Sequence, residues 1–206
     1  MQVWMRNCME SCHFSRRHRS VQVAFCGQLC GTKPRNGCRA QSLRTARPFP
    51  EQAVLAYRGI QRVGQKSGDT PTQRSAMANI STRAPEDPNA ADQLAYLNLL
   101  LGEDVDKNLA IAKKLTEQYP NRLAYRVTAA LGCLRQYNPG AALAELNAPV
   151  PIDWKETLPG WRAVYAATLL GSDRNEEAQK IIATIPRDRL NPEERALIEG
   201  KAGRKP

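Results

Sequence analysis

Two pairs of cysteines near the N-terminus have a spacing that could bind metal or form disulfides. Each pair encloses three residues, and 13 residues separate the pairs. The pairs are Cys8–Cys12 and Cys26–Cys30, and further donors nearby are His13, His18 and Cys38. Thiolate and imidazole groups suit tetrahedral zinc, but these spacings match no standard finger. We therefore favour unstructured sequence here and predict no metal site and no cofactor.

The same cysteine spacing resembles the twin motifs of the small Tim chaperones of the mitochondrial intermembrane space. That resemblance implies a helical hairpin closed by two disulfides. Here the residues between the pairs include Arg16, Arg17 and Arg19 instead of an amphipathic helix. The unstructured interpretation therefore stays ahead of it.

No residue pattern outside this segment predicts catalysis. Cys133 lies on an apolar helical stripe with no histidine near it in sequence, which indicates a buried small hydrophobe rather than a nucleophile. The pairs Glu176–Glu177 and Glu193–Glu194 fall in the first turns of predicted helices, where the helix dipole accounts for them. The sequence holds no glycine-rich phosphate loop, GxSxG or HExxH. We predict that the protein is not an enzyme.

The positive charge of the chain lies entirely in its front part. Residues 1–85 carry 14 Lys or Arg and 3 Asp or Glu, whereas residues 86–206 carry 16 and 17. The front segment could contact phosphates, yet no recognised nucleic-acid fold or aromatic interleaving accompanies its arginines. Nucleic acid is therefore not our expected partner. A metal- or nucleic-acid-binding front segment carried on a helical scaffold remains the alternative function.

Cysteine usage and hydropathy indicate a compartment. Five cysteines in the front segment cannot all pair with one another, which favours a reducing, cytoplasmic location. The longest uncharged run, residues 20–32, is shorter than the roughly 20 apolar residues of a spanning helix, so we predict no membrane span. The arginine-rich, acid-poor start leaves export or organellar targeting open.

The chain divides into three parts. Residues 1–50 lack any helical or strand period and are predicted to be disordered. Residues 51–85 predict a helix over 51–65, a linker over 66–73 and a short helix over 73–80. Met77 leads directly into the next part, so a start there, with the first 76 residues foreign to the protein, stays open.

Residues 86–200 predict a helical repeat domain. Prolines at 88, 120, 151 and 186 recur at intervals of 32, 31 and 35 residues, as in two-helix repeats. Apolar stripes predict helix pairs that end near Gly102, Pro120, Leu134, Asn147, Gly171 and Thr184. Asn191-Pro192 and Glu194 predict a last helix to about residue 200, which would cap the array. The predicted class is all-α, an α-solenoid of about three antiparallel pairs plus a capping helix.

These repeats resemble the tetratricopeptide repeat family over residues 86–190. Leu94, Leu97 and Leu101 stand at the first-helix positions of the first unit, Pro120 at its closing proline, and Asn98 at the glycine position. The resemblance implies a right-handed superhelix whose first helices line a concave groove for peptides or proteins. It implies that this groove exposes Asp92, Leu99, Leu131, Arg135, Arg162 and Ala166. The groove lacks the lysine and asparagine set with which some relatives grip a C-terminal carboxylate.

We therefore expect a non-enzymatic interaction module with a protein or peptide partner. Its oligomeric state stays open, as does continuation into a longer solenoid. Trp154, Trp161 and Tyr165 could form a ligand platform, but Trp161 and Tyr165 are four residues apart on the buried stripe, so we predict core packing.

Overall fold

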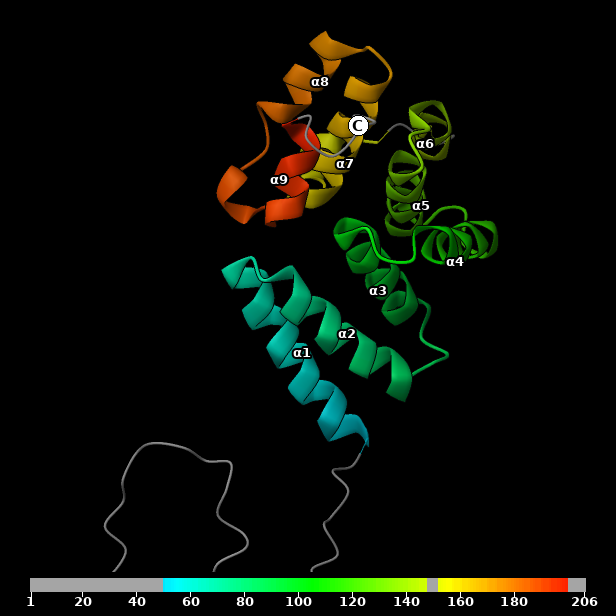
Figure 1. Ribbon diagram of the computed structural model, residues 1–206, viewed down its shortest axis with the longest axis vertical. Coiled ribbons are helices and arrows are strands. Elements are labelled where there is room, and N and C mark those ends of the chain that lie inside the picture. The colour runs from blue at the N-terminus through cyan, green and yellow to red at the C-terminus, as the bar shows by residue number, and fades with distance from the viewer. Residues whose placement is uncertain (1–49, 148–151, 200–206) are drawn as a thin grey trace, which may run out of the picture. The chain divides into compact units, whose positions relative to one another are not determined.

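The computed structural model describes residues 50–147 and 152–199, except the side chains of residues 50 and 51. This part of the chain forms nine α-helices and two short 3-10 helices and contains no strand (Figure 1), which confirms the all-α prediction. The α-helices are α1 (Pro50–Ser67), α2 (Thr70–Arg83), α3 (Pro88–Leu101), α4 (Val105–Gln118), α5 (Leu123–Arg135), α6 (Pro139–Leu146), α7 (Pro159–Gly171), α8 (Asn175–Ile182) and α9 (Pro192–Ile198). The 3-10 helices are η1 (Trp154–Glu156) and η2 (Arg187–Arg189). Among the described helices, none combines the length and the hydropathy that a membrane span requires.

The predicted disordered segment lies outside the described residues, apart from Pro50 at the start of α1. Its paired cysteines and both histidines are among the undescribed residues. The zinc, disulfide and nucleic-acid hypotheses for that segment therefore stay predictions.

Short polar side chains followed by proline set the starts of three helices. Asp69 accepts a hydrogen bond from the Thr72 amide at 3.0 Å, and Asp87 accepts one from the Asn89 amide at 2.9 Å. Asn138 caps α6 in the same way by accepting from the Ala141 amide. A proline lies in the first turn of each of these helices, where its missing N–H leaves no partner unsatisfied.

The predicted linker over 66–73 is too long at both ends, because residues 66–67 belong to α1 and residues 70–73 to α2. Gly68, with φ of 67°, and Asp69 make the whole turn between α1 and α2. Pro71 indicates a linker by composition, but it occupies the first turn of α2, where proline is tolerated. Met77 is 3% exposed inside α2, so a chain that starts there would lack α1 and the first half of α2.

The turn between α3 and α4 contains two residues with positive φ, Gly102 and Asp104. Gly102 ends α3 in a left-handed conformation with φ of 75°, as glycine after a helix commonly does. Asp104 stands at the start of α4 with φ of 46°, but its carboxylate makes no capping hydrogen bond. Asp106 lies in the first turn and accepts a bond from Gln136 instead, at 2.7 Å. Neither aspartate therefore caps α4 through its side chain.

Neighbouring helices pack in chain order. The pairs α1–α2, α3–α4, α5–α6 and α7–α8 each form a hairpin, and the second helix of a pair contacts the first helix of the next through α2–α3, α4–α5 and α6–α7. The first helices also contact one another, because α3 touches α5, α5 touches α7 and α7 touches α9. In addition α9 reaches α3, which brings residues about 100 positions apart into one neighbourhood.

One arginine contact recurs in two pairs. Arg126 is the fourth residue of α5 and donates from Nε to the Glu145 carbonyl at the end of α6, at 2.7 Å. Arg162 is the fourth residue of α7 and donates to the Thr184 carbonyl just after α8, also at 2.7 Å. Carbonyls at a helix end lack intrahelical partners, so each arginine satisfies one of them. The repeated geometry supports the sequence period.

The core is centred on α5. Residues 125–133 of α5 are all buried, because α3, α4, α6 and α7 surround the helix. Fully burying a leucine contributes about 1.5–3 kcal/mol, and Leu99, Leu100 and Leu131 are each at most 1% exposed. Gly132 lets α4 approach closely, since a Cβ there would lie 2.8 Å from Leu109 Cδ1.

Candidate functional site

A cavity of about 250 Å³ lies where α3, α5, α7 and α9 converge, with α1 and α2 adding to its wall. Ligand pockets for drug-sized molecules typically start at about 300 Å³. This cavity therefore suits one side chain or a small molecule. Its charged lining groups are the carboxylates Asp92 and Glu194 and the cation Arg189, and amide side chains from α1, α2 and α3 surround them.

Asp92 is a buried carboxylate with an unsatisfied oxygen. It is 5% exposed, and its Oδ1 has no hydrogen-bond partner in the described part of the chain. The Thr128 hydroxyl lies beside Asp92 and lowers its pKa. This hydroxyl has only one proton, which it also shares with the Ala124 carbonyl at 3.2 Å. Burial raises the pKa of Asp92 from 3.8 to about 6, against the opposing effect of Thr128. The group is thus mainly ionised at neutral pH, although an unpaired buried charge is costly.

Glu194 is the second carboxylate and is held at both oxygens. Its Oε2 accepts from the Asn191 amide at 2.9 Å, which is the capping-box contact that the sequence predicts. Its Oε1 accepts from the Tyr96 hydroxyl at 2.8 Å. Burial raises the pKa of Glu194, while these two hydrogen bonds oppose the shift. The pKa of Tyr96 is well above its ordinary value, first because of burial and then because of Glu194 and Asp92.

Hydrogen bonds between α2 and α9 fix one wall. The Gln73 side-chain amide donates to Asn191 Oδ1 at 3.0 Å. The fully buried Thr70 hydroxyl donates to the Glu193 carboxylate. Both links join residues more than 100 positions apart, so the wall forms only when the two ends of the described chain meet.

The start of α7 closes the cavity from another side. A Cβ at Gly160 would lie 2.2 Å from Glu194 Oε1, so only glycine leaves room for that carboxylate. Trp161 follows and lines the cavity with its apolar ring. Trp154 and Tyr165 instead stack on each other with centroids 4.1 Å apart and pack on the core. The core-packing prediction thus holds for Trp154 and Tyr165, whereas Trp161 packs against the core and also lines the cavity.

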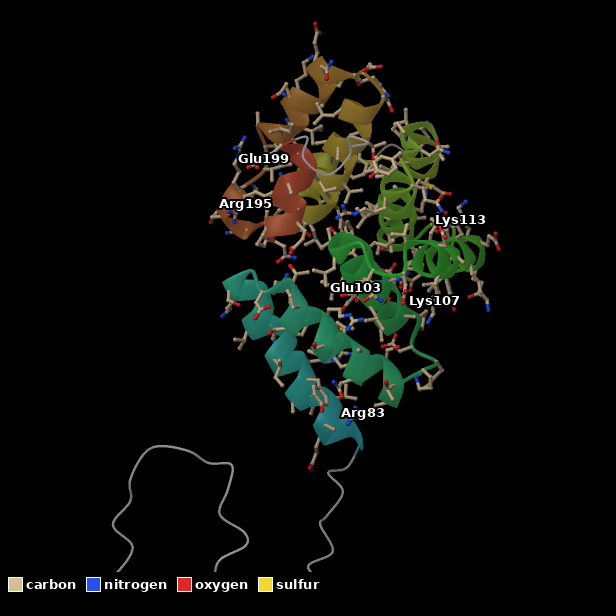
Figure 2. All side chains as sticks on the ribbon, in the orientation of Figure 1. Arg83, Glu103, Lys107, Lys113, Arg195 and Glu199 are labelled. Carbon is tan, nitrogen blue, oxygen red and sulfur yellow. The ribbon has the colours of Figure 1, made fainter. Side chains whose placement is uncertain are left out.

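Positive charge near the cavity is sparse. Arg189 is exposed and forms no ion pair with either carboxylate in the described structure. Lys107 and Lys113, labelled in Figure 2, extend from α4, which does not line the cavity. Both lysines are exposed to solvent. The two cavity carboxylates are therefore not neutralised by a nearby cation of this part of the chain.

The predicted groove residues fall into three groups. Asp92 lines the cavity, as described above. Leu99, Leu131 and Ala166 are each 0% exposed, so the expectation that a groove exposes them is wrong. Their helices are covered by neighbours on that side, and these three residues fill the core.

The two predicted groove arginines bind backbone carbonyls. Arg135 donates to the carbonyls of Leu99 and Leu100 near the end of α3, where a cation also suits the helix dipole. Arg162 is 8% exposed and donates to Thr184, as above, while its Nε has no partner among the described residues. Both contacts stabilise the fold, and neither side chain lines the cavity.

Sequence reasoning missed Tyr96, Gly160 and Glu194 as members of this site. Tyr96 follows Asp92 by four residues, a spacing that places both on one helix face. The capping-box pattern locates Glu194 at the start of a helix but does not say what lies opposite. Gly160 has no local signal.

Cys133 lies outside the site and matches its prediction. It is 2% exposed, and burial raises the pKa of its thiol. Within the described ranges, no group of three or more His, Cys, Asp or Glu side chains is placed to hold a metal ion.

Another depression, of about 260 Å³, lies between α1 and α2 beside Tyr57 and Ile60. It opens widely to solvent and its lining holds no charged side chain. The cavity of Asp92 is therefore the stronger candidate.

Comparison with protein-family models, curated proteins and solved structures found no match to the chain. The tetratricopeptide resemblance accordingly remains a prediction from the sequence.

Proposed function

We propose that the chain is a non-enzymatic interaction module that receives a short segment of a partner protein over the cavity, with one partner side chain entering it. The observation that carries this proposal is the polar cavity of about 250 Å³ where α3, α5, α7 and α9 converge. Its walls are held by hydrogen bonds within the chain before any ligand arrives, which lowers the entropic cost of binding.

The lining can bond a peptide backbone as well as a side chain. Gln65, Asn89 and Gln93 line the cavity and are themselves exposed, which places amide groups at its mouth. An amide side chain both donates and accepts hydrogen bonds, as a peptide group does. The apolar surfaces of Leu97 and Trp161 add contact area to the lining.

The helix order supports the same proposal. In the tetratricopeptide resemblance the first helices of successive pairs line the binding face, and here α3, α5 and α7 all contribute to the cavity. The proposed binding face differs from the predicted one in its residues, because Leu99, Leu131 and Ala166 are core residues.

A random peptide library displayed on phage tests the proposal with the purified full chain as bait. Ala124 lines the cavity on α5, so Ala124→Phe should fill it. Ala110 is exposed on α4, and Ala110→Phe is the matched control. Arg135 and Arg162 are unsuitable test positions because their loss would leave buried carbonyls unsatisfied.

We expect enriched peptides to bind the native chain and the Ala110→Phe variant and to lose at least tenfold in affinity for Ala124→Phe. Failure to enrich any peptide, or equal binding to both variants, would overturn the proposal. Circular dichroism at 222 nm should confirm that both variants keep their helices.

A further inference from the structure

Resting on the proposed function, we propose that the group entering the cavity is a cation, a primary ammonium or guanidinium on an alkyl stem, with Asp92 as its counter-ion. The partner segment would thus anchor through a lysine or arginine side chain. Asp92 carries this inference because it is a buried carboxylate with an unpartnered oxygen that lines a cavity.

Among the buried side-chain atoms that line the cavity, the one without a hydrogen-bond partner in the described structure is an acceptor, Asp92 Oδ1. Both Asp92 and Glu194 are acceptors when ionised, whereas the Tyr96 hydroxyl proton is already used by Glu194. The Gln73 side-chain amide is likewise occupied, through its bond to Asn191. A ligand that brings N–H donors can satisfy this acceptor, and ammonium and guanidinium groups bring three and five.

The charge and the shape of the lining also favour a cation on an apolar stem. An anionic ligand would meet two carboxylates, and the cation in the cavity lining, Arg189, lies exposed. The stem of a lysine or arginine is apolar, and Leu97, Pro159 and Trp161 provide apolar wall for it. A cation near the Trp161 ring would also gain from the ring quadrupole.

The position of Asp92 on α3 makes the site specific. It lies one helical turn before Tyr96, which in turn holds Glu194 from α9 at 2.8 Å. A cation paired with Asp92 therefore enters a cavity whose second carboxylate is already oriented. The Oδ1 atom of Asp92, which has no partner in the described structure, is the atom that such a ligand contacts.

Titration of the full chain by two-dimensional NMR at pH 7.5 tests this inference, with blocked tripeptides as probes. Acetyl-Gly-Lys-Gly-amide and acetyl-Gly-Arg-Gly-amide are compared with the uncharged norleucine peptide and with free n-butylamine. Asp92→Asn removes the counter-charge with little change in shape, and Asp106→Asn removes an exposed charge of α4 as the matched control.

We expect the lysine or arginine peptide to shift the resonances of cavity residues and to bind at least tenfold more tightly than the norleucine peptide. Asp92→Asn should weaken that binding at least tenfold, and Asp106→Asn should leave it unchanged. Equal binding of the norleucine peptide, or an unaffected Asp92→Asn variant, would overturn the inference. Binding of n-butylamine without either charged peptide would overturn the partner-derived source of the cation.

The two proposals can fail separately. If selected peptides lose binding to Ala124→Phe but need no lysine or arginine, the interaction function stands and the cationic anchor is wrong. If no peptide is selected at all, the interaction function itself is wrong.

Discussion

Replacing Asp92 with asparagine should stabilise the folded chain at neutral pH. The carboxylate is 5% exposed, and its pKa rises from 3.8 to about 6 mainly because of burial. Each pKa unit corresponds to about 1.4 kcal/mol between protonation states. The ionised form therefore costs about 3 kcal/mol of folding free energy, which an uncharged amide of the same shape would remove in large part.

The sign of the pH dependence follows from the raised pKa. The folded state holds the Asp92 proton more tightly than the unfolded state does, so stability falls as pH rises from about 4 to about 6. Above the folded pKa the loss is complete. Other titratable groups near the cavity are Glu194, Tyr96, Tyr125 and Arg189, and the comparison with Asp92→Asn separates Asp92 from them.

Urea unfolding followed by circular dichroism measures the effect at pH 4.5 and at pH 7.5. We expect the free energy of unfolding of Asp92→Asn to exceed that of the native chain by about 2–3 kcal/mol at pH 7.5 and by about 1 kcal/mol at pH 4.5. Asp106→Asn, at an exposed position, should differ from the native chain by at most about 0.5 kcal/mol at both values. A destabilised Asp92→Asn, or a gain that does not change with pH, would refute the reasoning about burial.

Four further substitutions test the packing and one helix cap, each by urea unfolding at pH 7.5. Leu131→Ala should lower the free energy of unfolding by about 2–5 kcal/mol because Leu131 is 0% exposed. The control Leu55→Ala, at a side chain that is 67% exposed, should lower it by less than about 1 kcal/mol. Gly132→Ala should lose about 1–3 kcal/mol, since the new Cβ would lie 2.8 Å from Leu109 Cδ1; an equal or higher stability would contradict the close helix approach. Asn138→Ala should lose about 1 kcal/mol through the cap of α6, and no loss would argue against that cap.

The helices were largely predictable because their signals are local. The Asn138-Pro139 start and the Gly102 end follow from capping chemistry within a few residues. The start of α2 was missed because Gly68 and Pro71 indicate a linker by composition. In the structure Gly68 belongs to a two-residue turn, and Pro71 lies in the first turn of α2.

The site was only partly predictable because its contacts join distant segments. Asp92 was identified from the expected groove face, but Leu99, two turns further along the same face of α3, and Leu131 of α5 turned out to be core residues. A repeat period does not tell which sides of a first helix its neighbours cover. The Tyr96–Glu194 hydrogen bond spans 98 positions, and nothing in either local pattern indicates the other partner.

The same argument connects stability to function. A buried carboxylate that destabilises the folded chain is typical of residues retained for binding. If Asp92 serves a cation, its substitution should raise stability and lower affinity together. The two measurements on Asp92→Asn thus check one physical cause.

The most direct test is the pKa of the Asp92 carboxyl group in the full chain, with and without saturating acetyl-Gly-Lys-Gly-amide. The ¹³C resonance of the carboxyl carbon follows the titration. We expect a pKa of about 6 in the free chain and a value at least one unit lower in the presence of the peptide, because a bound cation favours the ionised form. An Asp92 pKa that is the same in both samples would contradict a cationic ligand at this carboxylate.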